Sequence, residues 1–348
     1  MAEDFAEVLF PDIPLIDGHV HVRSPDLVGA IAEGMDSGGC LRLAFVSITR
    51  PEGTQNEMLR RYKKANADRF YTFGALDYGA EVWLNPNQAG VKALAARLGE
   101  QPARLKAEGF DGIKMIESKP TSRRRLPWPL DSEVYAQFFA NAEKTGLPLI
   151  WHVGDPPQFW DPHQIHAAAR ARGWLYDRPG DASLEQMRSE AENVLRRHLG
   201  LRVIFAHFFF LSHELDRARA MFKRHPNVCF DTTPGAQMFI NFIPKREEAR
   251  EFFLEFQDRI IFGTDLNDGS FAAGRDCGGG RQHRLARAYY GTDGVMPSNF
   301  PGADRVPEGQ EIQGLELPKD ALRSVFAENF ERIVGKKPAS LPTSDKPA

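Results

Sequence analysis

Residues 14–21 read PLIDGHVH, a short apolar run that ends in an aspartate, a glycine and two histidines. In a β-strand, side chains at positions i and i+2 point to the same face, so His19 and His21 would project together while Val20 points away. Two neutral imidazoles directed at one point form half of a metal site. The same pair could equally be two partly exposed polar residues at the end of a strand, so this stretch leaves both interpretations open.

Seven further apolar segments of strand length follow along the chain. The predicted strands are 14–17, 43–48, 71–77, 112–116, 148–152, 202–207, 228–231 and 260–265. Strands that alternate with helical segments indicate parallel βαβ units. Eight such units, with no strand-rich half, predict an α/β fold of the closed (β/α)₈ TIM-barrel type. No GxGxxG or GxxxxGK[ST] loop follows any predicted strand, which removes the main reason to prefer a nucleotide-binding open sheet.

Capping residues indicate where several helices begin and end. We expect one helix from Asp131 as N-cap to just before Gly146, and another from Ser183 as N-cap to Gly200. Further helices are expected at 212–223, 245–256 and 319–334.

The domain organisation follows from the same pattern. Two connections are long, 154–200 after the fifth strand and 267–319 after the eighth, and in a barrel both lie on the active-site face. We therefore expect a single domain over residues 1–335 with long loops after strands 5 and 8. Residues 336–348 are polar and rich in proline and serine, which predicts a disordered tail.

The composition limits the class of protein. The chain has 348 residues, 42% of them hydrophobic, and its 44 lysines and arginines against 47 acidic residues give a net charge of −3. This balance argues against binding to nucleic acid or to an anionic membrane surface. No apolar stretch is long enough to cross a bilayer, and the acidic N-terminus does not have the form of a signal peptide. The scattered Cys40, Cys229 and Cys277 suit a reducing compartment, so we expect a cytoplasmic protein.

Side chains that can bind a metal follow four of the predicted strands. His19 and His21 end the first strand, His152 the fifth, His207 the sixth and Asp265 the eighth. Each alone could be a satisfied core histidine or a helix N-cap. A (β/α)₈ barrel places its catalytic groups at the carboxyl ends of its strands, so these five side chains are expected to converge. Nitrogen and oxygen donors of this kind form a coherent ligand set for a divalent ion.

The segments that carry these residues also resemble a known family. IDGHVH, GFDGIKM, LIWHVGD, VIFAH, NVCFDTTPG, IIFGTDL and ENFERIVG occur in the expected order over roughly residues 14 to 335. In them the chain resembles the amidohydrolase superfamily, and within it the "amidohydrolase 2" branch that includes α-amino-β-carboxymuconate-ε-semialdehyde decarboxylase. The resemblance implies one divalent metal ion held by His19, His21, His152 and Asp265, with His207 beside it.

The identity and number of the metal ions stay open at this point. Zinc (Zn²⁺) is the default for three nitrogen ligands and one oxygen ligand with an open position, and Mn²⁺ or Fe²⁺ are the alternatives. Lys114 could be carboxylated and bridge two ions, as in other branches of the superfamily, and Glu117 is a further candidate ligand. Both residues could instead be structural or solvated charges at a strand end.

The resemblance implies an enzyme, but the branch contains more than one activity. The first expectation is a hydrolase that uses a metal-activated water on a small carbonyl compound, carboxylated or cyclic. Asp265 would then move a proton, and His207 would stabilise the developing oxyanion. The alternative is non-oxidative decarboxylation of a carboxylated aromatic or muconate-like acid. The intact ligand set counts against a third hypothesis, a ligand-binding barrel without catalysis.

Substrate-binding groups are expected in the stretch SRRRLPWP, residues 122–129, which follows the fourth strand. Arg123, Arg124 and Arg125 could bind a substrate carboxylate, because a guanidinium presents a bidentate fork to it. A solvated basic loop is the alternative. Trp128 could line an apolar pocket.

Asp231 follows the seventh strand and is expected at the site, either against the substrate or as the carboxylate partner of a ligating histidine. Asp17 is a competing candidate for the second role. The expected partner is a small molecule, anionic if the arginines bind it. Members of the branch often form dimers, so the resemblance also implies a homodimer.

Overall fold

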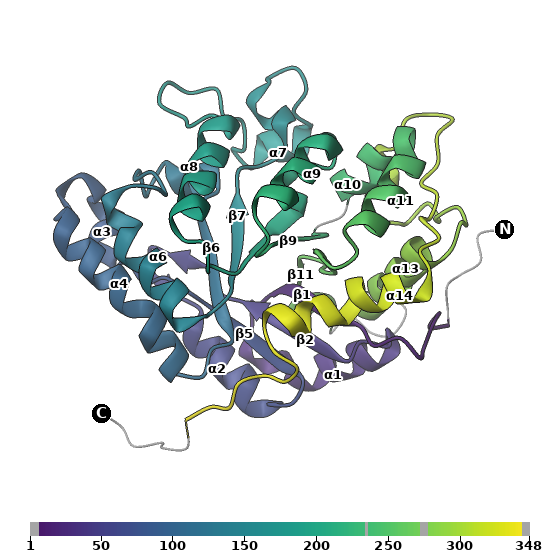
Figure 1. The fold of residues 1–348 in the computed structure, drawn as a ribbon, viewed down its shortest axis with the longest axis horizontal. Coiled ribbons are helices and arrows are strands. Elements are labelled where there is room, and N and C mark those ends of the chain that lie inside the picture. Colours follow the sequence, from purple (N-terminus) through teal and green to yellow (C-terminus); the bar gives the residue numbers. More distant parts are fainter. Residues whose placement is uncertain (1–6, 234–235, 272–277, 343–348) are drawn as a thin grey trace.

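The computed structural model describes residues 7–233, 236–271 and 278–342, which form a parallel sheet surrounded by helices (Figure 1). The strands of the main sheet occur in the order β10-β9-β8-β7-β6-β5-β2-β1-β11, and all of their pairings are parallel. They are β1 (Ile16–His21), β2 (Arg42–Val46), β5 (Phe70–Ala75), β6 (Gly112–Ser118), β7 (Leu149–Val153), β8 (Val203–Phe205), β9 (Val228–Asp231), β10 (Ile260–Ile261) and β11 (Leu266–Asn267). The predicted barrel-type α/β fold is confirmed. The short strands β3 (Thr49–Arg50) and β4 (Gly53–Thr54) form a separate hairpin.

The sheet returns to its first strand through the last barrel segment, residues 260–267. β10 pairs with β9 and β11 pairs with β1, although both belong to this one stretch of chain. Between them, the N–H of Gly18 donates to the carbonyl of Phe262 and the N–H of Asp265 donates to the carbonyl of His19, each at 2.9 Å. The predicted eighth strand therefore exists but is interrupted, and Asp265 at the interruption has a left-handed φ of 58°.

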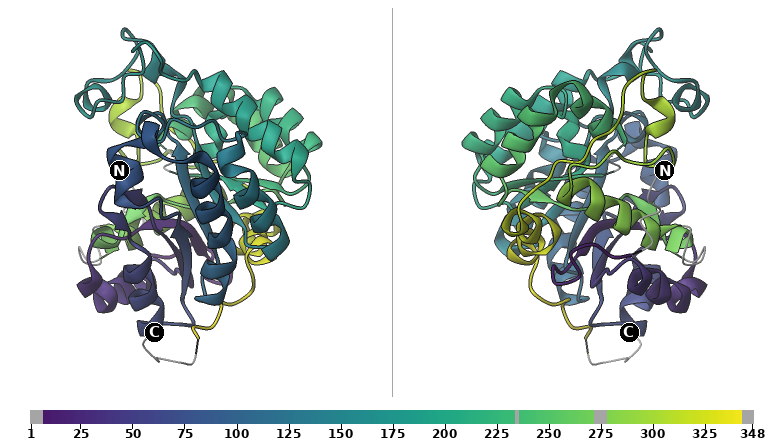
Figure 2. Two further views of the ribbon diagram at one scale, coloured as in Figure 1. Left: turned by 90° about the vertical axis from the view of Figure 1, so that its left-hand side faces the viewer. Right: turned by 90° about the vertical axis from the view of Figure 1, so that its right-hand side faces the viewer.

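Helices cover the sheet on its outer side, as all the views show (Figure 2). They are α1 (Val28–Ser37), α2 (Asn56–Ala65), α3 (Ala80–Leu84), α4 (Val91–Ala107), α5 (Pro120–Arg123), α6 (Glu133–Thr145), α7 (Ala167–Ala171), α8 (Leu184–Arg197), α9 (Leu215–Arg224), α10 (Ala236–Phe242), α11 (Arg246–Glu255), α12 (Asp268–Phe271), α13 (Gly279–Gly291), α14 (Lys319–Arg323) and α15 (Asn329–Ile333). Within the described residues, no helix combines the length and apolar character that a membrane crossing requires.

The predicted helix ends are correct only in part. Ser183 caps α8 by accepting the N–H of Gln186, as predicted, but that helix ends at Arg197. α6 ends at the predicted glycine but begins after Ser132. Asp131 does not cap it, because its carboxylate accepts a hydrogen bond from Asn193 at 2.6 Å.

The two long connections are not simple loops. The first contains α7 and α8 and buries a small cluster of its own, formed by Phe159, Ile165, Ala169 and Tyr176. The second contains α12 and α13. Of the predicted tail, residues 343–348 lie outside the described residues, whereas the N–H of Ala339 donates to Asp111 at 2.5 Å.

The barrel interior is filled by residues that alternate with the outward-facing ones along the strands. These inward residues include Ile16, Ala44, Val46, Tyr71, Phe73, Ile150, Ile204, Cys229 and Ile261, and they pack against Phe330 and Ile333 of α15. The apolar filling leaves the polar side chains at the carboxyl ends of the strands, where the sequence predicts the site.

A left-handed turn follows β8 and directs the sixth-strand histidine. His207, Phe208, Phe209 and Phe210 have φ values of 61°, 55°, 52° and 50°. Each such residue costs about 1–2 kcal/mol. Burial of a phenylalanine side chain stabilises by about 1.5–3 kcal/mol, and all three here are at most 8% exposed, so packing offsets the strain.

We predict opposite effects for two glycine-to-alanine substitutions. At Gly112 in β6, an added Cβ would lie 2.2 Å from Phe73 and 2.7 Å from the carbonyl of Pro148, so Gly112→Ala should lower the free energy of unfolding by about 1–3 kcal/mol. At Gly29 in α1, an added Cβ would have no neighbour within 4 Å. Because alanine favours a helix more than glycine does, Gly29→Ala should raise the free energy of unfolding by up to about 1 kcal/mol. Urea unfolding measures both, and a shift of the same sign in the two variants would contradict the packing argument.

Candidate metal centre

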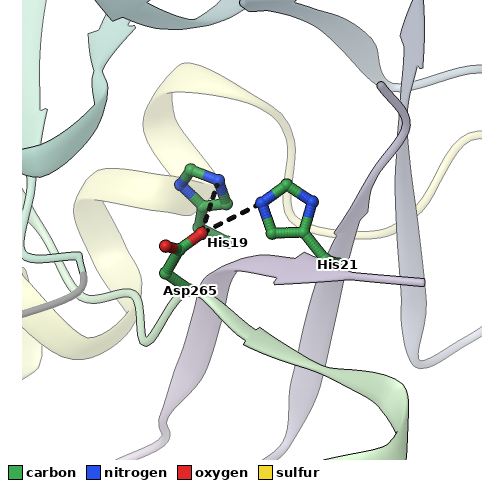
Figure 3. Close-up of side chains that lie close together, drawn as sticks. All are labelled: His19, His21 and Asp265. Carbon is green, nitrogen blue, oxygen red and sulfur yellow. Dashed lines mark ion pairs between the residues drawn. The ribbon is translucent and has the colours of Figure 1, made fainter. Parts of the chain in front are cut away.

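Three ligand-type side chains meet where β1 and the last barrel segment pair (Figure 3). Nε2 of His21 lies 3.0 Å and Nε2 of His19 lies 3.5 Å from Oδ1 of Asp265. Their ligand atoms all lie within 4.8 Å of one another. The His19 side chain is fully buried, whereas the His21 and Asp265 side chains are 27% and 25% exposed. A cation held by the three groups would therefore be reachable from solvent.

Local backbone geometry makes this convergence possible. His19 and His21 share one face of β1, and Val20 between them packs into the outer core, as the strand period predicts. Gly263 lies against the His19 side chain, because a Cβ at that position would be 3.2 Å from the Cβ of His19 and 2.7 Å from Thr233. Gly263, two residues before Asp265, thus allows the close approach of the two ligand-bearing segments.

Oδ1 of the Asp265 carboxylate lacks a hydrogen-bond donor among the described residues. Oδ1 is buried and makes no hydrogen bond of good geometry with any described residue, despite its two imidazole neighbours. Although burial raises the pKa of Asp265, His21 and His19 hold it well below its usual range. An ionised oxygen enclosed without a hydrogen bond is costly, and a divalent cation between it and the two ring nitrogens would satisfy it. These three residues therefore fit a metal ion.

Asp231 fixes the tautomer of His19. Its Oδ2 lies 2.8 Å from Nδ1 of His19, while Oδ1 accepts the N–H of His207 at 2.8 Å and the hydroxyl of Thr233 at 2.6 Å. Burial raises the pKa of Asp231, but these donors favour its ionised form. Because a carboxylate accepts, the proton of His19 is on Nδ1. The lone pair of Nε2 therefore points into the centre, where Nζ of Lys114 lies 2.8 Å away and a metal ion would have to replace that contact.

His152 and His207 form a second imidazole pair in which two lone pairs oppose each other. Nδ1 of His207 lies 2.8 Å from the carbonyl of Thr233, and Nε2 of His152 lies 2.8 Å from the carbonyl of Gly154. Carbonyls only accept, so both of these nitrogens carry protons. The remaining nitrogens, Nε2 of His207 and Nδ1 of His152, face each other at 2.8 Å. The pair must therefore share an additional proton or give its lone pairs to a cation.

The protonation of the buried histidines decides between these two outcomes. Burial, together with Lys119, lowers the pKa of His152 to about 4. Burial also holds the pKa of His207 and of His19 well below the ordinary value. An additional proton is thus unfavourable at neutral pH, and a cation is the better way to satisfy the opposed lone pairs.

The four histidines form a continuous row of rings. The centroids of His21 and His19 are 5.3 Å apart, those of His19 and His207 5.8 Å, and those of His207 and His152 4.4 Å. The predicted residues are thus brought together at one end of the barrel. The tight group within the described residues contains His19, His21 and Asp265, while His152 reaches it through His207.

Lys114 and Glu117, both in β6, lie in different surroundings. Nζ of Lys114 is 2.8 Å from Nε2 of His19, so this lysine belongs to the centre, and burial lowers its pKa to about 8. Glu117 is buried beside Tyr78, and its Oε1 has no hydrogen-bond partner among the described residues. It is not part of the three-residue group.

The predicted arginines already have partners within the protein. Arg123 is buried and pairs with Glu190 at 3.0 Å, and Arg124 makes two bonds of 2.7 Å with the carboxylate of Asp181. Arg125 is exposed. These contacts tie the segment after β6 to the long connection after β7, and carboxylate binding by the arginines stays a prediction. The half-buried Trp128 packs against the outer core.

A cavity of about 250 Å³ shares Asp265 with the candidate centre. Its wall is largely apolar and includes Phe239, Phe262, Ala286, Tyr290, Phe300 and Pro301, with Thr232, Thr264 and Gln282 as polar members. The hydroxyl of Tyr290 is buried and makes no hydrogen bond with a described residue. None of these residues was predicted, because no local pattern shows that α10 and α13 pack beside the eighth strand.

Comparisons with known proteins identify a family for this chain. The model of a family described as amidohydrolase (Amidohydro_2) matches residues 16–336. A comparison with curated proteins finds no relative that matches.

Solved structures share the fold at low sequence identity. An uncharacterised TIM-barrel protein from Bordetella bronchiseptica has a TM-score of 0.55 at 13% identity, covering 92% of this chain and 98% of its own. A 4-oxalomesaconate hydratase from Rhodopseudomonas palustris has a TM-score of 0.52 at 14% identity, and the match covers 92% of this chain and 95% of the hydratase. A 5-carboxyvanillate decarboxylase from Novosphingobium aromaticivorans, complexed with manganese and 4-hydroxy-3-methoxy-5-nitrobenzoic acid, has a TM-score of 0.51 at 13% identity, covering 96% and 99%.

We predict that Asp231→Asn weakens metal binding. The amide can no longer hold the proton on Nδ1 of His19 as firmly, so affinity for a divalent ion should fall by about 10- to 100-fold. Competition with a chromogenic chelator measures this. Asp111→Asn is the matched control, because Asp111 is also buried and bonded to Lys63 and Thr72 but lies before β6, at the opposite end of the barrel. An equal loss of affinity in the control would contradict the assignment.

We also predict a pH-dependent stability difference at Glu117. Burial raises its pKa from 4.5 to about 7, so stability is fully present below pH 4.5 and is lost as the pH rises through 7. Glu117→Gln stays neutral, so its stability relative to the parent should grow by roughly 2–3 kcal/mol between pH 5 and pH 8. Urea unfolding at both pH values tests this, with Glu311→Gln at an exposed position as control. A constant difference would show that Glu117 is not a buried neutral acid.

Proposed function

Because the chain belongs to the amidohydrolase family, and is an enzyme of this superfamily, we propose that it is a metal-dependent decarboxylase of a small carboxylated ring compound. The observation that carries the proposal is the convergence of His19, His21 and Asp265 beside an apolar cavity, where Oδ1 of Asp265 has no hydrogen-bond partner among the described residues.

One divalent ion is proposed, held by His19, His21 and Asp265, with His152 as the fourth ligand that the family resemblance implies. Zinc suits nitrogen and oxygen donors, and manganese is supported by the complex of 5-carboxyvanillate decarboxylase. Bound at this position, the ion would polarise a substrate oxygen and stabilise negative charge that develops on it.

The substrate body is proposed to occupy the 250 Å³ cavity. A cavity of about 150 Å³ holds benzene, so this volume suits one substituted ring. Phe239, Phe262 and Phe300 supply apolar walls, and the free hydroxyl of Tyr290 offers one hydrogen bond to a ring substituent.

The proposed reaction uses proton transfer by residues of the chain. The bond between the ring carbon and the carboxylate breaks, carbon dioxide leaves, and the electron pair stays on the ring carbon. A proton must then reach that carbon. Asp265 is ionised, so it would first take a proton from water or from a hydroxyl of the substrate and then pass it to the ring carbon. Its place beside both the centre and the cavity suits this transfer. His207, held by the carbonyl of Thr233, is oriented with its Nε2 toward Nδ1 of His152.

Two considerations favour decarboxylation over hydrolysis. Loss of carbon dioxide disperses the charge of a carboxylate, and apolar walls such as those of this cavity favour that dispersal. The solved structures of similar fold with an assigned activity include a decarboxylase and a hydratase of acidic compounds. Hydrolysis remains the second candidate, because the partial exposure of His21 and Asp265 leaves room for a water molecule.

The cellular setting is a further part of the proposal. Cys40 and Cys229 are buried free thiols, which suits the cytoplasm, whereas Cys277 lies outside the described residues. A homodimer is proposed from the family resemblance.

We predict that chelation abolishes activity and that Mn²⁺ or Zn²⁺ restores it. A panel of hydroxylated benzoic acids, lactones and amides, assayed with and without added ion, should give metal-dependent release of carbon dioxide from a benzoic acid, with at least about 100-fold loss on chelation. Incorporation of oxygen-18 from labelled water, without carbon dioxide, would instead establish a hydrolase. Activity that survives complete chelation would contradict both.

A further inference from the structure

Asp17, in β1, is fully buried, and its carboxylate is saturated with hydrogen bonds. Oδ1 accepts the N–H of Thr264 at 3.0 Å and that of His19 at 3.3 Å. Oδ2 accepts the hydroxyl of Thr264 at 2.6 Å and Nε2–H of His283 at 3.0 Å. An ionised carboxylate has about four acceptor sites, so the four donors match its full capacity.

Three of these bonds, from His19 and Thr264, connect the two segments that carry the candidate ligands. His19 is itself a ligand candidate, and Thr264 immediately precedes Asp265. The left-handed φ of 58° at Asp265 is costly for a residue with a side chain, and it persists only where the surroundings hold it. Asp17 holds the preceding residue by both its backbone and its side chain, and thereby fixes the direction in which Asp265 leaves the barrel segment.

His283, on α13, completes the arrangement from outside the barrel. It is fully buried, and its ring packs against Phe262 and Phe271 at centroid distances of 6.0 and 5.5 Å. Its Nδ1 has no hydrogen-bond partner among the described residues, so its bond to Asp17 is the polar contact that its position provides. Cys40 also lies beside the ring, but its Sγ donates to the carbonyl of Arg42, so the Asp17 carboxylate is the acceptor that accounts for a histidine here.

We propose that Asp17 and His283 are a positioning pair that orients His19 and Asp265 for metal binding. The proposal rests on the metal centre of the proposed function and goes beyond it, because neither residue touches the ion or the substrate. The pair acts through Thr264 and through the backbone of β1.

A second buried carboxylate holds the same segment independently. Asp268 accepts the N–H groups of Arg23 and Ser24 at 2.7 and 2.9 Å and the hydroxyl of Tyr62 at 3.0 Å. The end of the barrel segment that follows Asp265 therefore stays attached when His283 is replaced, and we expect such variants to fold.

The test compares two substitutions of His283 by their affinity for Mn²⁺ and Zn²⁺. His283→Phe keeps a ring of similar size but loses the donor, and should bind each ion about 10- to 100-fold more weakly. His283→Gln keeps an N–H donor and should recover most of the affinity. Leu285→Ala, at a buried position of the same helix, is the control, because it should lower the thermal unfolding temperature without changing the affinity.

Competition with a chromogenic chelator, together with thermal unfolding, separates the outcomes. Parent-like affinity in His283→Phe, or an equal loss of affinity in Leu285→Ala, would overturn the positioning role and leave the proposed function standing. A parent protein that binds neither ion would overturn the metal centre and this proposal with it.

Discussion

The site depends on one backbone contact, the return of the last barrel segment onto the first strand. The bonds from Gly18 to Phe262 and from Asp265 to His19 close the sheet and at the same time bring a carboxylate from near the end of the chain to the histidines at its beginning. Closing the barrel and assembling the centre are therefore the same event. The carboxylate of Asp265 is held in place by the fold itself, since sliding the segment by one residue would turn the side chain to the opposite face.

The surroundings of the histidines are arranged to leave lone pairs free. Asp231 and the carbonyls of Thr233 and Gly154 accept hydrogen bonds from ring nitrogens of His19, His207 and His152, respectively. The other nitrogen of each ring therefore faces inward. Burial keeps these rings neutral. Lys114 meets the inward lone pair of His19, whereas the inward lone pairs of His207 and His152 oppose each other. That imbalance, next to an ionised carboxylate, is the physical basis for inferring a metal ion at this centre.

The sequence predicted the strands and the polar residues at their ends, because both follow from short-range patterns. The period of two places His19 and His21 on one face, and apolar runs mark the strands. It could not predict the interruption before Asp265, the helices α7, α12 and α13 or the cavity beside α13, because these depend on packing between distant segments. The helix α8, which also lies in a long connection, was predicted from its N-cap Ser183. Nor could charge type alone show that Lys114 points to the centre while Glu117 lies beside Tyr78, since β6 has an irregular register between Met115 and Ser118.

Backbone strain is concentrated at the centre, and its compensation lies outside it. The left-handed turn that begins at His207 is balanced by phenylalanines that pack between the barrel and the helices, where Phe208 contacts Phe230, Phe242 and Phe252. The imidazole is consequently fixed by apolar packing on one side and by hydrogen bonds on the other. A histidine held in this way has little freedom to reorient toward an alternative partner, so the opposed ring nitrogens persist until a cation or a proton resolves them.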